Sequence, residues 1–266
     1  GAEPNPVTGI ANARRLRLWR ESVLLLVLLA TLGLILAAGP IPQDPRLLVY
    51  ADDRAALGMP NFFNVVSNVV FLLVGTAGLV SGLSGRISGA ERSWFVLFLG
   101  IALVCFGPAY SPWRPANDPP VWARLPMTLA FMALFAAVVS EHIGERWEPW
   151  LLAPALLVGI ASVLWWDRSG DLRFYIWVQL SPFLALVVLL ISYPGRYSHR
   201  AYLWYGLGLY ALAKLAEGLD REIYSITAQA LSGHVLKHLL AAASVFVIYL
   251  MLLRRSALPN RERGPT

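Results

Sequence analysis

Residues 62–83 read FFNVVSNVVFLLVGTAGLVSGL, a stretch that contains no charged side chain. A helix needs about 20 mostly apolar residues to cross the hydrocarbon core of a bilayer. The apolar residues here are contiguous rather than alternating, which argues against a membrane β-strand. The stretch therefore predicts a transmembrane α-helix.

The composition of the whole chain agrees with a membrane protein. Of its 266 residues, 57% are hydrophobic and only 14% are charged, whereas an ordinary soluble domain has about 25% charged residues. These values exclude a soluble enzyme, a disordered protein and a nucleic-acid binder of the usual kind. A single cysteine, Cys105, excludes an internal disulfide and a thiolate zinc cluster.

Seven further apolar stretches lead us to expect an all-α integral membrane protein with eight spans and no soluble domain. The expected spans are residues 22–38, 62–83, 94–110, 125–142, 150–166, 174–193, 202–215 and 234–253. The first resembles a secretory signal peptide because four arginines precede it, but we interpret it as a retained anchor helix. Residues 1–21 and 254–266 are expected to be tails, and residues 39–61 an outer loop.

The distribution of arginines predicts the orientation. With the N-terminus inside, the inner segments contain nearly twice as many arginines as the outer loops, as the positive-inside rule requires. We therefore expect both termini on the cytoplasmic side of a bacterial-type inner membrane. The net charge of +6 then reflects contact with anionic headgroups, and no nucleic acid is expected as a partner.

Polar side chains gather where the second span begins. Asn61, Asn64 and Asn68 are spaced i, i+3 and i+7, which places them on one face of a continuous helix. Together with Ser67 and with Asp52 or Asp53 from the preceding loop, they could bind a hard cation. The alternative is hydrogen bonding that holds helices together.

A second polar group surrounds the start of the last span. His234 and His238 are spaced i, i+4, which suits two ligands of one metal ion. The alternative is a pair that forms hydrogen bonds with Glu217 or Asp220. The polar residues expected to support this site are Lys214, Glu217, Asp220, Ser232 and Lys237.

A third segment, residues 107–128, is rich in proline and tryptophan. We expect a rigid loop at the membrane interface, with Trp113 and Trp122 in an aromatic belt. It should lie on the same membrane face as the start of the last span. Polar groups in lipid tend to pair with one another. We therefore expect one set of polar side chains to point into a single cavity. The set is His234, His238, Asn64, Ser67 and Glu217.

Four short stretches together resemble the alkaline ceramidase family of the CREST superfamily of membrane hydrolases. They are Asp52-Asp53-Arg54, NFFNVVSN at 61–68, WARLPMT at 122–128 and SGHVLKH at 232–238. The likeness is closest to bacterial members and extends from about residue 51 to residue 253. It implies a seven-helix core at 62–253, preceded here by one extra helix. It also implies a zinc-dependent amidase that cleaves the acyl amide of ceramide.

The chain departs from the family pattern at the active site. The family holds zinc with three histidines and adds a serine and an aspartate, and only His234 and His238 match. The positions of the serine, the first histidine and the aspartate are occupied by Pro108, Pro112 and Ala123, none of which can bind a metal or transfer a proton. Nearby residues that could substitute are Ser111, Asn117 and Asp118.

We therefore expect a ceramidase-like protein without hydrolase activity that acts as a lipid-binding or accessory, structural membrane subunit. Its partners would be membrane lipids and other membrane-protein subunits. Zinc binding should be weakened, and calcium binding is doubtful because Asn61 replaces a carboxylate of the family. The alternative is a zinc-dependent amidase that hydrolyses ceramide-like lipids at a rearranged site. A retinal protein would need a carboxylate facing Lys237, and the flanking histidines fit the zinc family better.

Overall fold

The computed structural model describes residues 6–113 and 120–259, and the regular secondary structure of these residues is helical. The α-helices are α1 (Pro6–Ala37), α2 (Phe62–Val66), α3 (Val69–Leu83), α4 (Glu91–Val104), α5 (Tyr110–Trp113), α6 (Val121–Ile143), α7 (Glu148–Ser169), α8 (Arg173–Ser192), α9 (Ala201–Gly218), α10 (Asp220–Ile226) and α11 (Gly233–Arg254). Two short 3-10 helices, η1 (Pro45–Leu48) and η2 (Glu145–Trp147), lie between them.

Six helical segments in the described residues are long and apolar enough to cross a membrane. They are Arg14–Ala37, Phe62–Leu83, Val121–Ile143, Glu145–Ser169, Arg173–Ser192 and Gly233–Arg254. The polytopic, all-helical architecture expected from the sequence is therefore confirmed, but the count of eight spans is not. The two remaining candidates correspond to α4, which has only 14 residues, and to α9, whose 18 residues include Lys214 and Glu217.

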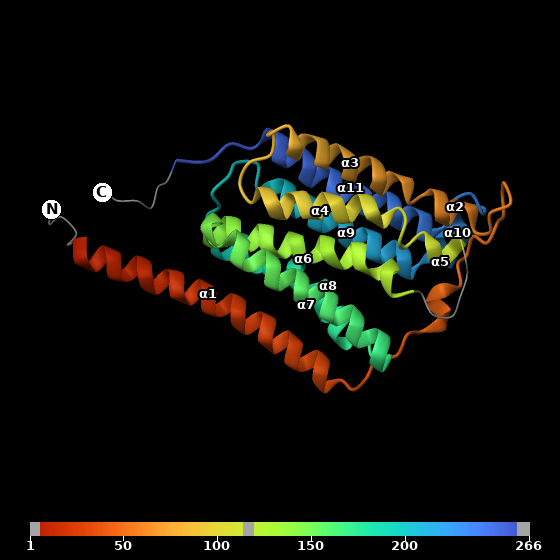
Figure 1. Ribbon diagram of the computed structural model, residues 1–266, viewed down its shortest axis with the longest axis horizontal. Helices are drawn as coiled ribbons and strands as arrows, with labels where there is room; N and C mark the ends of the chain where they lie inside the picture. The colour runs from red at the N-terminus through yellow and green to blue at the C-terminus, as the bar shows by residue number, and fades with distance from the viewer. Residues whose placement is uncertain (1–5, 114–119, 260–266) are drawn as a thin grey trace.

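Helix α6 lies at the centre of the bundle, where it packs against α4, α7 and α8 (Figure 1). Its inner positions are small: Ala133, Ala136 and Ala137 have no exposed surface. Small side chains allow helices to approach closely inside a bilayer. Helix α11 packs mainly against α9 and also against α3. The last helix therefore contacts the second predicted span, to which α3 belongs.

Helix α1 packs along α8 and leaves most of its own side chains exposed. Two side chains of α8 attach to its backbone: Trp177 Nε1 donates to the Leu28 carbonyl at 3.1 Å, and Arg173 Nη1 donates to the Leu36 carbonyl at 2.5 Å. The helix begins at Pro6, although residues 1–21 were expected to be a tail. Alanine, arginine and leucine are strong helix formers, and they continue the helix ahead of the apolar stretch.

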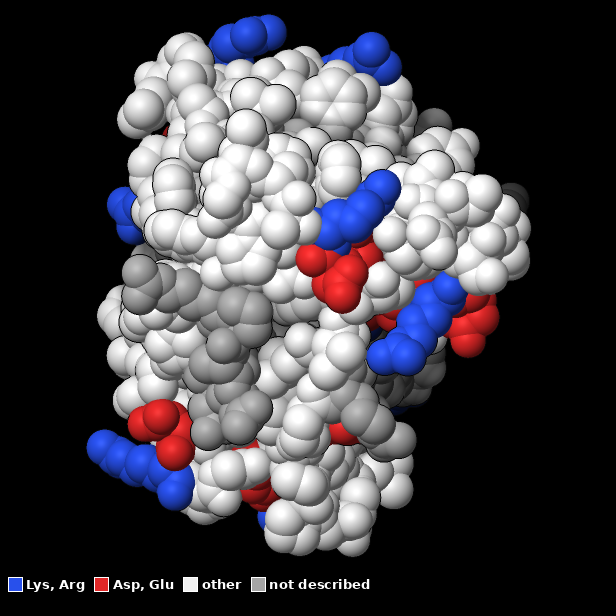
Figure 2. Space-filling model, turned by 90° about the vertical axis from the view of Figure 1, so that its right-hand side faces the viewer, with Lys and Arg blue, Asp and Glu red and all other residues white. Residues whose placement is uncertain are grey.

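The start of α1 and the end of α11 lie at one end of the bundle, which we call the terminal end (Figure 1). The opposite end carries α5, α10 and the start of α11, and we call it the α10 end. The face of the molecule at the α10 end is largely uncharged, with scattered Lys, Arg, Asp and Glu (Figure 2).

The second predicted span is interrupted near its start. Helix α2 ends at Val66 and α3 begins at Val69. Ser67 Oγ and Asn68 Nδ2 both donate to the Asn64 carbonyl, at 3.2 and 2.8 Å. Such side-chain bonds compete with the α-helical pattern, although Ser67 and Asn68 keep right-handed helical backbone angles. Asn61 precedes α2 with a left-handed backbone (φ 49°), so it does not belong to one continuous helix with Asn64 and Asn68.

Most of the described residues of the segment 107–128 are helical, although a loop was expected. Residues 110–113 form α5, and α6 begins at Val121, so Trp122 and the residues that follow it to Thr128 are helical. Pro120 immediately precedes the first turn of α6 and has an extended backbone, a position where the missing N–H of proline does no harm. Trp113 and Trp122 remain exposed, at 47% and 49%.

Candidate ligand cavity

A cavity of about 310 Å³ lies inside the bundle, between α3, α4, α6, α8, α9 and α11. Much of its wall is aliphatic, with Leu97, Leu134, Leu186 and Ile248 among the lining residues. The remaining lining includes a set of polar and ionisable side chains. This set comprises Tyr50, Asn68, Arg124, Gln179, Lys214, Glu217, His234, Lys237 and His238.

Both histidines of the last helix line this cavity. Their ring centroids are 4.6 Å apart, and the rings are nearly perpendicular, at 77°. Ser67 Oγ lies 2.7 Å from His238 Nδ1, so one nitrogen of that imidazole already has a hydrogen-bond partner. The edge of the Tyr50 ring approaches His234, with centroids 4.7 Å apart.

Glu217 lies between two lysines. Its Oε1 accepts a hydrogen bond from Lys237 Nζ at 2.9 Å, and its Oε2 pairs with Lys214. Lys237 Nζ is also 3.4 Å from each ring nitrogen of His234. Glu217 therefore neutralises lysines, and it is not a hydrogen-bond partner of the imidazoles as the alternative interpretation required.

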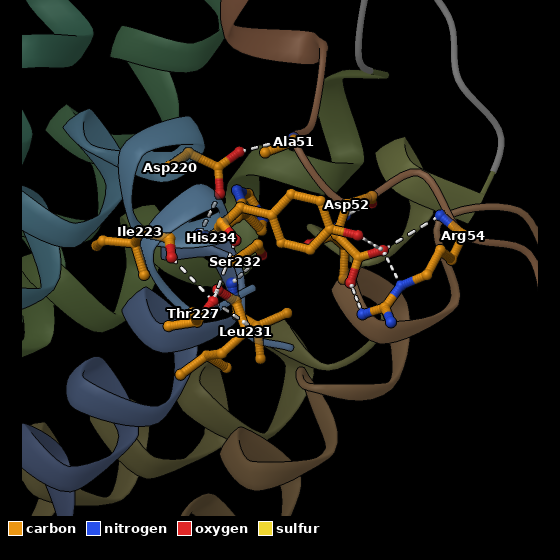
Figure 3. A network of polar contacts seen from close by, with 12 residues as sticks. Ala51, Asp52, Arg54, Asp220, Ile223, Thr227, Leu231, Ser232 and His234 are labelled. Carbon is orange, nitrogen blue, oxygen red and sulfur yellow. Dashed lines mark hydrogen bonds and ion pairs between the residues drawn. The ribbon is translucent and has the colours of Figure 1, made fainter. Parts of the chain in front are cut away.

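Asp220 and Ser232 fix the start of α11 (Figure 3). Asp220 accepts from the backbone N–H of His234 at 2.7 Å and from that of Ala51 at 2.8 Å. The Ser232 hydroxyl accepts from the Val235 N–H at 3.1 Å, as an N-cap. A carboxylate at a helix N-terminus is also stabilised by the helix dipole. Both side chains thus position His234 through its backbone.

The predicted cation site is a network of hydrogen bonds at the edge of the cavity. Arg54 holds both carboxylate oxygens of Asp52, at 2.8 and 2.7 Å, and this hydrogen bonding lowers the pKa of Asp52. Asn64 Nδ2 donates to the Asp52 carbonyl at 2.7 Å. Asn68 is among the residues that line the cavity, whereas Asn64 is not. The Oδ1 atoms of Asn64 and Asn68 are buried without a hydrogen-bond partner.

The donors around Asp52 fall short of a calcium site. Calcium takes six to eight oxygen ligands, and the guanidinium of Arg54 already occupies the carboxylate of Asp52. Asn61 directs its amide nitrogen, a donor, to the Pro112 carbonyl at 2.8 Å. These hydrogen bonds therefore hold the loop that precedes α2 against α2 and α5.

The three positions that depart from the family pattern lie around the same cavity. Pro108 and Ala123 line it, and Pro112 is buried behind it. In residues 6–113 and 120–259, no group of three His, Cys, Asp or Glu side chains is placed to hold a metal ion. Since catalytic zinc takes three protein ligands, the two histidines alone do not fit it. Ser111 lines the cavity, whereas Asn117 and Asp118 lie outside the described residues.

Arg124 is a cavity residue that the sequence interpretation did not assign to the site. Its guanidinium stacks over the rings of Trp166 and Tyr175, at 3.9 and 4.9 Å from their centroids. It donates to Gln43 Oε1, and its Nε is buried without a hydrogen-bond partner. The sequence shows Arg124 as a cation in the RLPMT stretch, but only the fold shows that it lines the cavity.

Tyr50 was also missed, because it precedes the second span and belongs to no motif. Its ring lines the cavity beside His234. Burial raises the pKa of Tyr50 to about 12, with additional contributions from the negative charges of Glu217 and Asp220. Its hydroxyl therefore stays protonated at neutral pH and remains available as a hydrogen-bond donor.

No protein-family model matches this chain, and no curated protein matches it either.

Proposed function

We propose that this chain is a ceramidase-like membrane protein that binds a lipid in its central cavity without hydrolysing it. The observation that carries the proposal is the composition of the cavity wall: aliphatic and aromatic residues along its length, with titratable groups gathered among Lys214, Glu217, His234 and Lys237. Predominantly apolar walls with a few polar groups are typical of small-molecule sites. An amphiphile with one apolar chain has the matching chemistry.

Contacts between the family-like stretches support the ceramidase resemblance. Ser67 meets His238 at 2.7 Å, which joins the second stretch to the last. Asn64 bonds to the Asp52 carbonyl and so joins the second stretch to the first. The third stretch contributes Ala123 and Arg124 to the cavity. Segments that are far apart in the sequence thus meet at one site, as the resemblance implies.

The lining chemistry argues for binding over hydrolysis. Hydrolysis of an amide needs a directed water and a group that transfers its proton, a contribution of about 10²–10⁴-fold in rate. Pro108, Pro112 and Ala123 supply neither. Two imidazoles would leave zinc with water at its other positions and without the surroundings that orient such water.

We further propose that the chain crosses the membrane eight times, with both termini in the cytoplasm of a bacterial-type inner membrane. The packing of α4 against α6 and of α9 against α11 supports two additional crossings. Helix α1 would then be an extra helix outside the seven-helix core, and its exposed apolar side would face lipid or another membrane subunit. Reporter fusions after residues 21, 143 and 254 should all report the cytoplasm.

A cavity-filling variant tests lipid binding. The full-length protein in nanodiscs would be titrated with a fluorescent long-chain ceramide, and its affinity compared with that of Ala241→Phe, because Ala241 lines the cavity. The matched control is Ala211→Phe, which adds the same ring at an exposed position of α9. Weaker binding in Ala241→Phe alone is expected. Equal binding in all three proteins would overturn the proposal.

One observation favours the alternative, a zinc-dependent amidase: the imidazoles of His234 and His238 face each other beside Ser67. The native protein and a Pro108→Ser/Pro112→His/Ala123→Asp variant would be compared for zinc content and for release of fatty acid from ceramide. Gain of zinc and turnover only in the triple variant is expected. Turnover by the native chain would establish the amidase instead.

A further inference from the structure

The charges that line the cavity do not balance. Three cations, Arg124, Lys214 and Lys237, face a single carboxylate, Glu217. Glu217 is already shared between the two lysines. With the histidines neutral, the lining residues therefore carry a net charge of about +2 at neutral pH.

Arg124 is the cation without a carboxylate. In the described part of the chain its contacts are the rings of Trp166 and Tyr175 and the amide oxygen of Gln43. Its Nε is shielded from solvent and has no hydrogen-bond partner. A guanidinium has five N–H donors in a rigid fork, and an unmet donor in a buried place is costly. Because Nε is closed to a water-sized molecule, an anion bound in the cavity would have to meet the terminal N–H groups of this guanidinium.

Asp220 does not remove this imbalance. It lies at the start of α11, where its two carboxylate oxygens accept from the backbone N–H groups of His234 and Ala51. It is not among the residues that line the cavity. Both of its oxygens are therefore occupied by backbone N–H groups, and Glu217 remains the only carboxylate among the lining residues.

The cations lie toward the α10 end, near the start of α6 and α11 and the end of α9. The apolar lining continues along α11 from Lys237 to Ile248, which is about 16 Å of helix. The cavity volume of about 310 Å³ is at the lower end of the range of about 300–1,000 Å³ for ligand pockets. This space suits one alkyl chain better than two.

We propose that the cavity holds a single-chain lipid with a phosphate-monoester headgroup, bound by Arg124 and Lys237. This inference rests on the proposed lipid-binding function and names its ligand class. A phosphate monoester carries about −1.5 to −2 charges at neutral pH, which matches the excess of the lining, whereas a carboxylate would neutralise half of it. The planar fork of arginine also suits bidentate recognition of phosphate.

Native mass spectrometry of the full-length protein in detergent tests the headgroup. Three lipids with the same chain would be titrated: oleoyl lysophosphatidate, oleate and monooleoylglycerol. We expect lysophosphatidate to bind at least about tenfold more tightly than uncharged monooleoylglycerol, and more tightly than oleate. Binding of oleate as tight as that of lysophosphatidate would overturn the assignment to phosphate.

Variants identify the residues that carry this preference. Arg124→Gln and Lys237→Met should each weaken lysophosphatidate binding about 10- to 100-fold and leave monooleoylglycerol binding unchanged. Glu217→Gln removes the opposing charge and should strengthen lysophosphatidate binding. The control Arg168→Gln removes a charge from an exposed position in the last turn of α7 and should change neither affinity.

The outcomes separate this inference from the proposed function. Equal binding of lysophosphatidate and monooleoylglycerol, with both lost in Ala241→Phe, would overturn the phosphate headgroup and leave the lipid cavity intact. Failure of all three lipids to bind would overturn both. Loss of both lipids in Arg124→Gln would show a structural role for Arg124. The Glu217→Gln variant would then test the charge argument, because weaker lysophosphatidate binding in that variant contradicts it.

Discussion

Both ends of the bundle contain ion pairs, but they balance their charges differently. At the terminal end, Glu141 accepts hydrogen bonds from Arg255 at 2.6 and 2.7 Å, from Trp94 Nε1 at 2.7 Å and from the Ala90 N–H at 3.1 Å. The side chains of Arg255 and Glu141 are only 2% and 7% exposed. One carboxylate is thus matched by one guanidinium and two neutral donors.

At the α10 end, three cations line the cavity with one carboxylate, Glu217. Glu217 pairs with Lys214 and Lys237, so Arg124 has no acidic partner among the lining residues. Each end also contains a guanidinium Nε that is buried without a hydrogen-bond partner, that of Arg255 at the terminal end and that of Arg124 at the α10 end. The two ends therefore differ in their balance of charge and not in the presence of an unmet donor. Burial of charge alone therefore does not mark a binding site in this bundle. The distinguishing feature is the excess of cations beside a cavity.

Breaking the pair at the terminal end should have the largest effect on stability. Arg255→Met leaves the Glu141 carboxylate buried without its cation, which costs about 3–5 kcal/mol. Unfolding in a denaturing detergent measures the loss. The Glu141→Leu/Arg255→Met double variant should recover most of it, because neither charge then remains unpaired. A loss below about 1 kcal/mol in Arg255→Met would contradict a structural role for this pair.

A tight helix contact at the α10 end should have the next largest effect. A Cβ at Gly233 would lie 2.1 Å from the Ala216 carbonyl and 2.6 Å from Asp220 Cα, so Gly233→Ala must push α9 and α11 apart. Overpacking of this kind costs about 1–3 kcal/mol. Because Gly233 precedes His234, lipid binding should weaken as well.

The matched control for that substitution is Gly208→Ala in α9, where a Cβ meets nothing within 4 Å. An alanine in place of a helical glycine stabilises by about 0.5–1 kcal/mol. Thermal unfolding in the same detergent should therefore move in opposite directions for the two variants. A stabilised Gly233→Ala protein would refute the close contact between α9 and α11.

The smallest expected effect on stability comes from acidification and concerns Asp171. This carboxylate is fully paired although it lies at the α10 end. The side chain of Arg173 lowers the pKa of Asp171 by hydrogen bonding, and the N–H groups of Arg173 and Ile41 add to the shift. A carboxyl whose folded pKa is lowered contributes stability above its unfolded pKa of about 3.9. That contribution is lost as the pH falls through the folded pKa.

Acidification below about pH 4 should therefore loosen the connection between α1 and α8, where Asp171 accepts from Ile41 at 3.1 Å. Hydrogen exchange of residues 38–44 measures this loosening. The Asp171→Asn variant should exchange faster at neutral pH and change less on acidification. The same pH dependence in both proteins would exclude Asp171 as the responsible group.

The sequence alone determined the features that depend on neighbouring residues. Apolar stretches such as 62–83 and 234–253 form long helices because a chain in lipid must satisfy its backbone within each segment. The i, i+4 spacing of His234 and His238 places them on one face of α11 for the same local reason. The departures at Pro108, Pro112 and Ala123 were also legible as residue types, and all three lie at or next to the cavity.

Only the tertiary structure decided which groups balance one another. Glu141 and Arg255 are 114 positions apart, and nothing near either residue identifies its partner. The interruption at Ser67 and Asn68 accompanies side-chain bonds to the Asn64 carbonyl, and Asn64 Nδ2 donates to the carbonyl of Asp52, 12 positions away. Arg124 became a cavity residue because α6 packs against α7 and α8 and supplies the rings under its guanidinium. Charge compensation inside the bundle depends on distance in space, and a pattern along the chain does not contain that distance.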